Sequence, residues 1–166
     1  MLKFSRLFKH LFATTRHTKK YFSASALKDI ENAIAASEIG HSGQIQVVIE
    51  TSLSPYALIH QQSPRDRAIE VFSLQNIWDT EHNNGVLIYL LMADHAIEII
   101  ADRGIHLNVG DEFWQQTCRK IENQLKNGFF LGGVLEGILE IDQILRKFYP
   151  SEVITPNELS DHPIII

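Results

Sequence analysis

The chain has 166 residues, of which 45% are apolar and 21% are charged, and it contains one cysteine, Cys118. This length suits one domain with a hydrophobic core, and the composition excludes disorder over the whole chain. A single cysteine excludes an internal disulfide and a cysteine-based zinc cluster, and the apolar runs are too short to form a transmembrane helix.

Charge is unevenly distributed along the chain. Residues 1–28 contain seven Lys or Arg and no acidic residue, whereas residues 29–166 contain eight Lys or Arg and twenty Asp or Glu. We therefore divide the chain into a basic N-terminal arm, an acidic α/β body and a C-terminal tail, which comprise residues 1–22, 23–150 and 151–166. The body is expected to repel nucleic acid, and the arm to attract anionic phosphates. A mitochondrial transit peptide is the alternative interpretation of the arm.

The arm begins with the pattern of an amphipathic helix. The apolar residues that recur at the spacing of one helical face are Phe4, Leu7, Phe8, Leu11 and Phe12. Such a helix, with an aromatic face and a cationic rim, suits the surface of an anionic membrane. Packing of the helix on its own domain is the equal alternative. Residues 16–20 are basic without apolar periodicity and are predicted to be a linker.

The first half of the body alternates between helix and strand signals. Capping serines and Pro at first helical positions mark two of the helices. The predicted elements are a helix over residues 25–38, a half-buried strand over residues 44–51, a short helix opened by Ser54-Pro55, and a helix from Ser63-Pro64 to about Trp78 that buries Ile69 and Phe72.

The second half of the body is predicted to contain a hairpin and two helices. The apolar run over residues 86–92 predicts a strand buried on both faces. Asp94-His95 predicts a turn into an antiparallel strand over residues 96–101. Gly137 lies inside the last predicted helix, where close packing is the expected reason for it. The apolar residues 164–166 are expected either to pair with a sheet edge or to fray.

The densest polar cluster precedes the most buried strand. Asp79 and Glu81 offer the oxygen ligands that Ca²⁺ or Mg²⁺ prefers. Asp102 and Arg103, which follow the second hairpin strand, add a carboxylate and a guanidinium that can hold phosphate. A solvated turn and an Asp–Arg ion pair are the alternatives. Glu50 is expected to approach the same region.

Other chemistries lack sequence support. The eight histidines are scattered without the spacing of a zinc site. The chain also lacks a phosphate-binding glycine loop, a dinucleotide fingerprint and a nucleophile elbow, so no nucleotide cofactor is expected.

Two segments resemble a known family. Asn83-Asn84-Gly85-Val86-Leu87, followed by a strand, an Asp-containing turn and a second strand ending near Gly104, resembles the TPM domain. That family is named for a thylakoid acid phosphatase, a photosystem II repair protein and a nematode receptor modulator. The segment over residues 127–134 is similar to the family's later glycine segment. The resemblance covers residues 25–148 and is greatest to a bacterial, soluble branch.

The resemblance implies a three-layer α/β/α sandwich with a mixed central sheet. It also implies binding of a divalent cation and a weak phosphatase activity. Typical relatives carry a signal peptide, and many carry a membrane helix after the domain, neither of which is expected here. Only Asn83, Asn84 and Gly104 are carried over as motif positions, and no catalytic role is assigned to them.

Two functions therefore stand as hypotheses. The first is a cytoplasmic binding domain that acts at the inner membrane, on an anionic membrane surface or a membrane protein, through Phe4, Leu7, Phe8, Leu11 and Phe12. The second is a Ca²⁺- or Mg²⁺-dependent phosphatase with a cation at Asp79, Glu81 and Asp102 and phosphate at Arg103, Asn83 and Asn84.

Overall fold

The computed structural model describes residues 4–152 and 157–166, so Met1, Leu2 and Lys3 of the arm lie outside the described residues. A four-stranded mixed sheet of order β3-β2-β1-β4 forms the middle layer. The strands are β1 (Gln44–Glu50), β2 (Gly85–Leu91), β3 (Ala96–Ala101) and β4 (Ile164–Ile165). β1 is parallel to both β2 and β4, and β2 is antiparallel to β3, which confirms the predicted hairpin. β4 places the end of the chain on the sheet edge.

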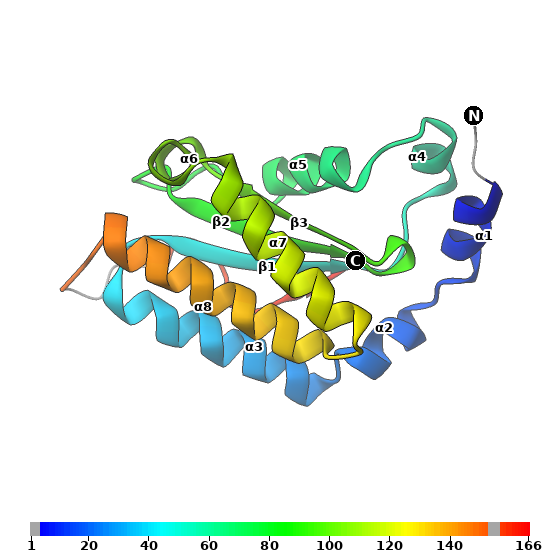
Figure 1. Cartoon of the computed structure of the whole chain (residues 1–166), viewed down its shortest axis with the longest axis horizontal. Helices are drawn as coiled ribbons and strands as arrows, with labels where there is room; N and C mark the ends of the chain where they lie inside the picture. Colours follow the sequence, from blue (N-terminus) through cyan, green and yellow to red (C-terminus); the bar gives the residue numbers. More distant parts are fainter. Residues whose placement is uncertain (1–3, 153–156) are drawn as a thin grey trace.

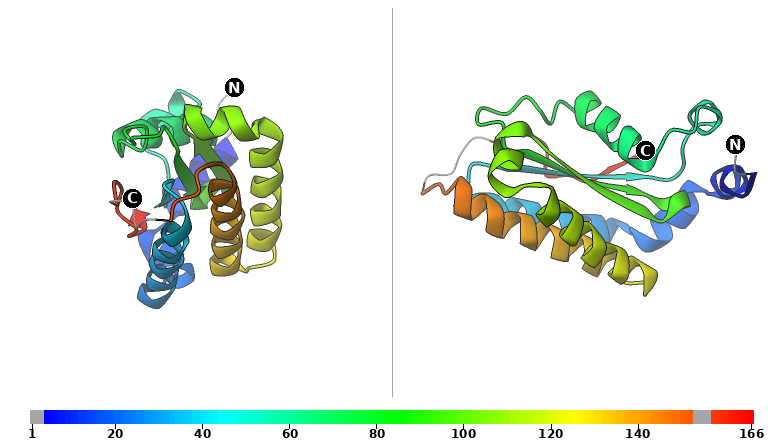
Figure 2. Two further views of the ribbon diagram at one scale, coloured as in Figure 1. Left: turned by 90° about the vertical axis from the view of Figure 1, so that its left-hand side faces the viewer. Right: turned by 45° about the horizontal axis from the view of Figure 1, so that its top comes forward.

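Helices cover both faces of the sheet (Figures 1 and 2), which confirms the three-layer sandwich. The first face is covered by α3 (Ala24–Ser37), α7 (Asp111–Lys126) and α8 (Phe130–Phe148). The second face is covered by α4 (Pro55–Ile59) and α5 (Pro64–Leu74). Among the described helices, none combines the length and hydropathy needed to cross a membrane.

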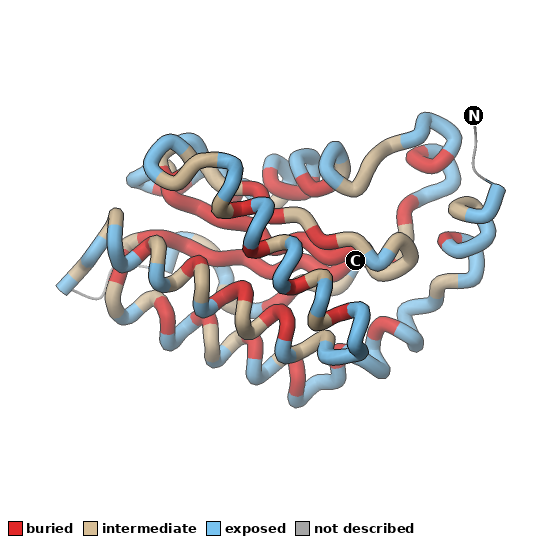
Figure 3. The backbone as a smooth tube through the Cα atoms, viewed as in Figure 1, coloured by how far each residue is buried: buried red, intermediate tan, exposed pale blue. Residues whose placement is uncertain are grey.

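The strand β1 is buried along its whole length, so the prediction of a half-buried strand was wrong (Figure 3). Its alternating polar residues are buried because they have partners. Gln44 Oε1 accepts hydrogen bonds from the backbone N–H groups of Glu158 and Leu159. Gln46 Nε2 donates to the carbonyl of His162. The polar face of β1 therefore binds the C-terminal segment rather than water.

Three local predictions also need correction. The helix α5 ends at Leu74 rather than Trp78, because Asn76 adopts a left-handed backbone (φ 54°) that ends the helical turn. Ile69 is exposed, whereas Phe72 is buried as predicted. A short helix, α6 (Arg103–Val109), follows β3 and was not predicted.

The arm forms two helices, α1 (Phe4–Phe12) and α2 (Thr15–Tyr21). The first confirms the predicted amphipathic helix. The second replaces the predicted linker and is capped by Thr14, whose hydroxyl accepts from the His17 N–H at 3.4 Å. Apolar periodicity is absent from α2 because its one buried residue is Thr18.

Gly137 confirms the expectation of close packing. A Cβ atom at this position would lie 2.5 Å from Ile121 Cδ1, so glycine lets α8 approach α7. Helix–helix contact at this point offsets the cost of about 1 kcal/mol for glycine in a helix interior.

Candidate functional site

Two regions at opposite ends of the sheet carry the polar residues of interest. We call residues 79–84 with Asp102 and Gly104 the polar edge, which lies where β2 begins and β3 ends. We call the contact of α1 with the carboxyl ends of β1 and β2 the arm junction. In open α/β sheets, ligands commonly bind outside the carboxyl ends of the strands, so the arm junction lies at the favoured end.

At the polar edge, Asn84 is fully buried and joins neighbouring segments. Its backbone N–H donates to Thr80 Oγ1 at 3.1 Å, and its Nδ2 donates to Ser42 Oγ at 3.3 Å. Asn83 has a left-handed backbone (φ 52°), and its carbonyl accepts from the Ile105 N–H at 3.3 Å. Asparagine tolerates this backbone better than most residues. Both motif asparagines are therefore explained by the turn that leads into β2.

Gly104 and Asp102 fix α6 against that turn. A Cβ atom at Gly104 would lie 2.5 Å from the Asn83 carbonyl oxygen and 2.7 Å from that of His82. Asp102 caps α6, because its Oδ1 accepts from the Arg103 N–H at 2.6 Å. The other oxygen, Oδ2, is buried without a hydrogen-bond partner among the described residues.

The predicted cation ligands do not form one set. Asp79 and Glu81 are exposed, and the Glu81 N–H is occupied by the carboxylate of Glu158 at 2.9 Å. Within residues 4–152 and 157–166, no group of three or more His, Cys, Asp or Glu side chains is placed to hold a metal ion. Asp79, Glu81 and Asp102 therefore do not fit a metal ion as a three-carboxylate set, and cation binding stays a prediction. Arg103, assigned to phosphate, is exposed.

Glu50 does not approach this edge, so that expectation was wrong. It ends β1 opposite Leu91, whereas Asp102 follows Ala101, which pairs with Val86 at the other end of β2. Because β1 is parallel to β2, Glu50 lies at the carboxyl end of β2. Because β3 is antiparallel to β2, Asp102 lies at the amino end of β2.

Glu50 instead forms a polar cluster within the body with Tyr89 and Arg67. Its Oε2 accepts from the Tyr89 hydroxyl at 2.7 Å and from Arg67 Nε at 2.8 Å. Burial and the neighbouring Glu50 carboxylate raise the pKa of the Tyr89 phenol, so the phenol stays a donor. Arg67 also pairs with Glu70 at 3.0 Å, and this guanidinium is therefore neutralised by carboxylates.

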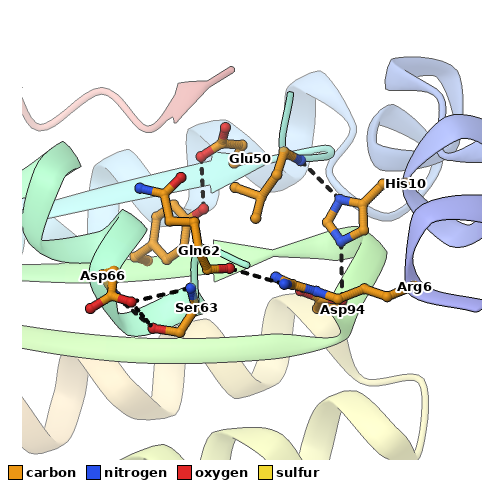
Figure 4. A network of polar contacts seen from close by, with 9 residues as sticks. Arg6, His10, Glu50, Gln62, Ser63, Asp66 and Asp94 are labelled. Atoms are coloured by element: carbon orange, nitrogen blue, oxygen red, sulfur yellow. Dashed lines mark hydrogen bonds and ion pairs between the residues drawn. The ribbon is translucent and has the colours of Figure 1, made fainter. Parts of the chain in front are cut away.

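At the arm junction, α1 is held by two basic side chains that meet Asp94 (Figure 4). Arg6 Nη2 lies 2.7 Å and Nε 3.0 Å from Asp94 Oδ2, and Arg6 Nη1 donates to the Gln62 carbonyl at 2.9 Å. His10 is buried; its Nδ1 accepts from the Leu53 N–H at 2.9 Å, and its Nε2 lies 3.0 Å from Asp94 Oδ1. Because Nδ1 is an acceptor here, the ring proton is on Nε2 and faces the carboxylate.

These contacts affect the protonation of Asp94. Burial acts to raise the pKa of this carboxyl, but the hydrogen bonds from Arg6 and His10 outweigh burial and hold its pKa below the usual range. Asp94 is therefore ionised at neutral pH. A bidentate Arg–carboxylate pair fixes orientation as well as position.

The docked face of α1 is its polar side. Arg6 and His10 are one helical turn apart and point at the body, and Leu7 beside them packs on the hydrophobic core that α4 and α5 form with the sheet. The opposite side, which we call the outer face, consists of Phe4, Phe8, Leu11 and Phe12. These residues remain exposed, from 57% for Phe8 to 77% for Phe12. Arg6 and His10 were not among the predicted site residues, because their local sequence gives no sign of a partner in a distant turn.

Comparisons with known proteins place the chain in a family. Residues 16–144 match the TPM domain. The NMR structure of the BA42 protein from the psychrophilic bacterium Bizionia argentinensis is 32% identical, over 87% of this chain and 94% of that chain, with a TM-score of 0.76. The N-terminal domain of a protein from P. gingivalis shares the fold, at 17% identity over 75% of this chain and 76% of that one, with a TM-score of 0.60. Curated proteins give no match. The chain therefore belongs to the TPM domain family.

Proposed function

We propose that this TPM-domain protein is a binding domain that docks peripherally on an anionic membrane surface through the outer face of α1. One observation carries the proposal. The helix uses its polar side to dock on the body and leaves four large apolar side chains exposed. An amphipathic helix that packs only on its own domain would bury its apolar side instead.

Charge supports an anionic surface as the partner. Residues 4–22 contain Arg6, Lys9, Arg16, Lys19 and Lys20 and no acidic residue. Arg6 is paired with Asp94, whereas the other four cations are exposed. Each Lys or Arg near an anionic leaflet contributes about 1 kcal/mol to binding. Apolar contact from the outer face adds to this attraction, since interfacial binding scales with buried apolar area.

Vesicle flotation of the full chain tests the proposal. We expect binding to phosphatidylglycerol-containing vesicles, weaker binding to pure phosphatidylcholine, and loss of binding at high salt. Leu11→Ala should weaken binding about five- to tenfold, because it removes part of a buried leucine's transfer free energy. The matched control is Leu107→Ala on α6, since Leu107 is 78% exposed and lies at the other end of the molecule (Figure 1).

Two results would overturn the proposal. One is equal flotation of the Leu11 and Leu107 variants, which would show that the outer face makes no contact. The other is binding to native membranes but not to protein-free anionic vesicles, which would assign the outer face to a membrane protein.

A Ca²⁺- or Mg²⁺-dependent phosphatase is the second hypothesis, and one observation favours it. Asp102 Oδ2 is a buried oxygen without a hydrogen-bond partner among the described residues, and buried carboxylates usually have partners. Titration calorimetry with Ca²⁺ and Mg²⁺ on the native chain and on Asp102→Asn tests cation binding. Absence of heat with the native chain would end this hypothesis.

A further inference from the structure

A groove lies between the arm and the body, beside the arm junction. It encloses about 350 Å³ and is bounded by α1, α2, the turn of η2 (Met92–Asp94) and the start of α8. This volume is at the lower end of the range for small-molecule sites, about 300–1,000 Å³. We propose that this arm groove binds a single-chain amphiphile with an anionic head, such as a fatty acid.

The walls of the arm groove are apolar. Phe12, Met92 and the ring pair of Tyr21 and Phe130, whose centroids are 4.1 Å apart, line it. The Thr18 and Thr51 side chains also line it, and their hydroxyls are hydrogen-bonded to each other at 3.0 Å. This hydrogen bond lowers the cost of placing an acyl chain against the pair.

The side chains at the rim of the arm groove that can carry charge near neutral pH are all basic. They are Lys9, His17 and His95, which are exposed, and no acidic side chain among the described residues lines the groove. Apolar walls below a basic rim match a molecule with an apolar chain and an anionic head. A cationic amphiphile would meet like charge at the rim.

His95 is held at the rim by an uncommon backbone. It adopts the left-handed region (φ 52°) at the end of η2, where its N–H bonds the Met92 carbonyl at 3.2 Å. Histidine, like asparagine, adopts this region more often than most non-glycine residues. The turn therefore presents the imidazole at the rim and tolerates asparagine in its place.

A separate hollow of about 20 Å³ shares Met92, His95 and Phe130 with the groove. It is too small for an acyl chain, so the chain would lie within the groove itself. Phe12 belongs both to the groove and to the outer face of α1, so the groove opens beside the proposed membrane contact.

Calorimetric titration of the full chain, without vesicles, tests the proposal. The probes are decanoate, decyltrimethylammonium and decyl maltoside, each below its micelle concentration. Decanoate should bind at least tenfold more tightly than the cationic and neutral probes. Lys9→Gln should weaken decanoate binding about five- to tenfold, the loss of one charge-assisted hydrogen bond, and His95→Asn should weaken it by a smaller factor. Asparagine keeps the left-handed backbone, so His95→Asn should fold normally.

Lys19→Gln is the matched control, because it removes the same charge from the arm at a residue that does not line the groove. It should change decanoate affinity by less than twofold. Equal affinity for the three probes, no binding of decanoate, or equal effects of Lys9→Gln and Lys19→Gln would overturn the proposal. Flotation is a separate readout: Leu11→Ala should weaken vesicle binding and keep decanoate binding, so failure of the membrane proposal leaves this one testable.

Discussion

The polar edge and the arm junction are built in different ways. At the polar edge, the backbone restricts which residues fit. Gly104 lies against two carbonyl oxygens, and Asn83 adopts a left-handed backbone in a turn. At the arm junction, side chains 88 residues apart in the sequence meet, as Arg6 does with Asp94. The motif of the family thus marks a position where the backbone needs particular residues. The more distinctive surface lies at the other end of the sheet and rests on a few side-chain contacts.

This difference predicts different consequences of mutation. Contacts at the polar edge connect β2, β3 and α6, so a change there should affect the whole domain. The helix α1 rests on the body through Arg6, His10 and Leu7, so a change there should release the arm and leave the body folded. Segments with few buried contacts open at low free energy.

The largest effect is expected from Gly104→Ala. The new methyl group would overlap two backbone carbonyls, which cannot rotate away as a side chain could. We expect the free energy of unfolding to fall by about 3 kcal/mol, at the upper end for overpacking, measured by urea denaturation. The control is Gly132→Ala, where the nearest atom is 3.9 Å away, and which should stabilise α8 by up to about 1 kcal/mol. A stable Gly104→Ala variant would show that α6 can move.

Asp94→Ala should have the next largest effect, and it should be confined to the arm. Arg6 and His10 would lose their shared partner, which costs about 1–3 kcal/mol of arm docking. Trypsin should then cleave faster after Arg16 and Lys19, while the urea midpoint of the body changes little. Asp79→Ala, an exposed aspartate at the polar edge, is the control and should leave cleavage unchanged. Equal protection of the Asp94 variant would show that the arm is held by other contacts.

The sequence predicts the layers of the fold well, because strong local signals mark them. The capping box of Ser63 and Asp66 is present, and the apolar run of β2 is buried on both faces. Predictions failed where a distant partner decides the outcome. Gln44 and Gln46 indicate a solvated face until the C-terminal segment binds them, and α6 depends on the Asp102 cap and on a fit that only Gly104 permits.

The candidate site was harder to predict for the same reason. The polar edge combined ligand-type residues in one segment, but local sequence does not show whether their side chains converge. Arg6 and His10 have ordinary spacing, and their partner Asp94 lies in a hairpin turn. Periodicity identified four residues of the outer face of α1, whereas the fifth, Leu7, packs on the body. It could not show that the polar face would be the docked one.

Acidification should weaken arm docking by less than Asp94→Ala does. The pKa of Asp94 is lowered by its partners when the arm is docked. For an acid with a lowered pKa, the stabilisation is complete above the ordinary pKa, about 3.9, and is lost as pH falls through the docked value. The tryptic sites in α2 cannot be assayed at low pH, so pepsin cleavage or amide exchange of residues 4–12 is the measurement. Asp94→Asn should remove the pH dependence, and its persistence in that variant would assign it to another group.

The opposite pH response is expected from Glu38, which lies in η1 (Glu38–Gly40) at the amino end of β1. Burial, and to a lesser degree Asp161, raises the pKa of this carboxyl to about 8, and its Oε1 lacks a hydrogen-bond partner among the described residues. An acid with a raised pKa stabilises the folded state below its unfolded pKa, and this contribution is lost as pH rises toward 8. Glu38→Gln should therefore gain stability relative to the native chain between about pH 4.5 and 8, followed by thermal denaturation. Asp94 and Glu38 should thus respond to pH in opposite directions, because Asp94 is paired with the Arg6 cation, whereas Glu38 has no such partner among the described residues. A constant difference between Glu38→Gln and the native chain over this range would show that the Glu38 carboxyl is hydrated and that the two ends do not differ in this respect.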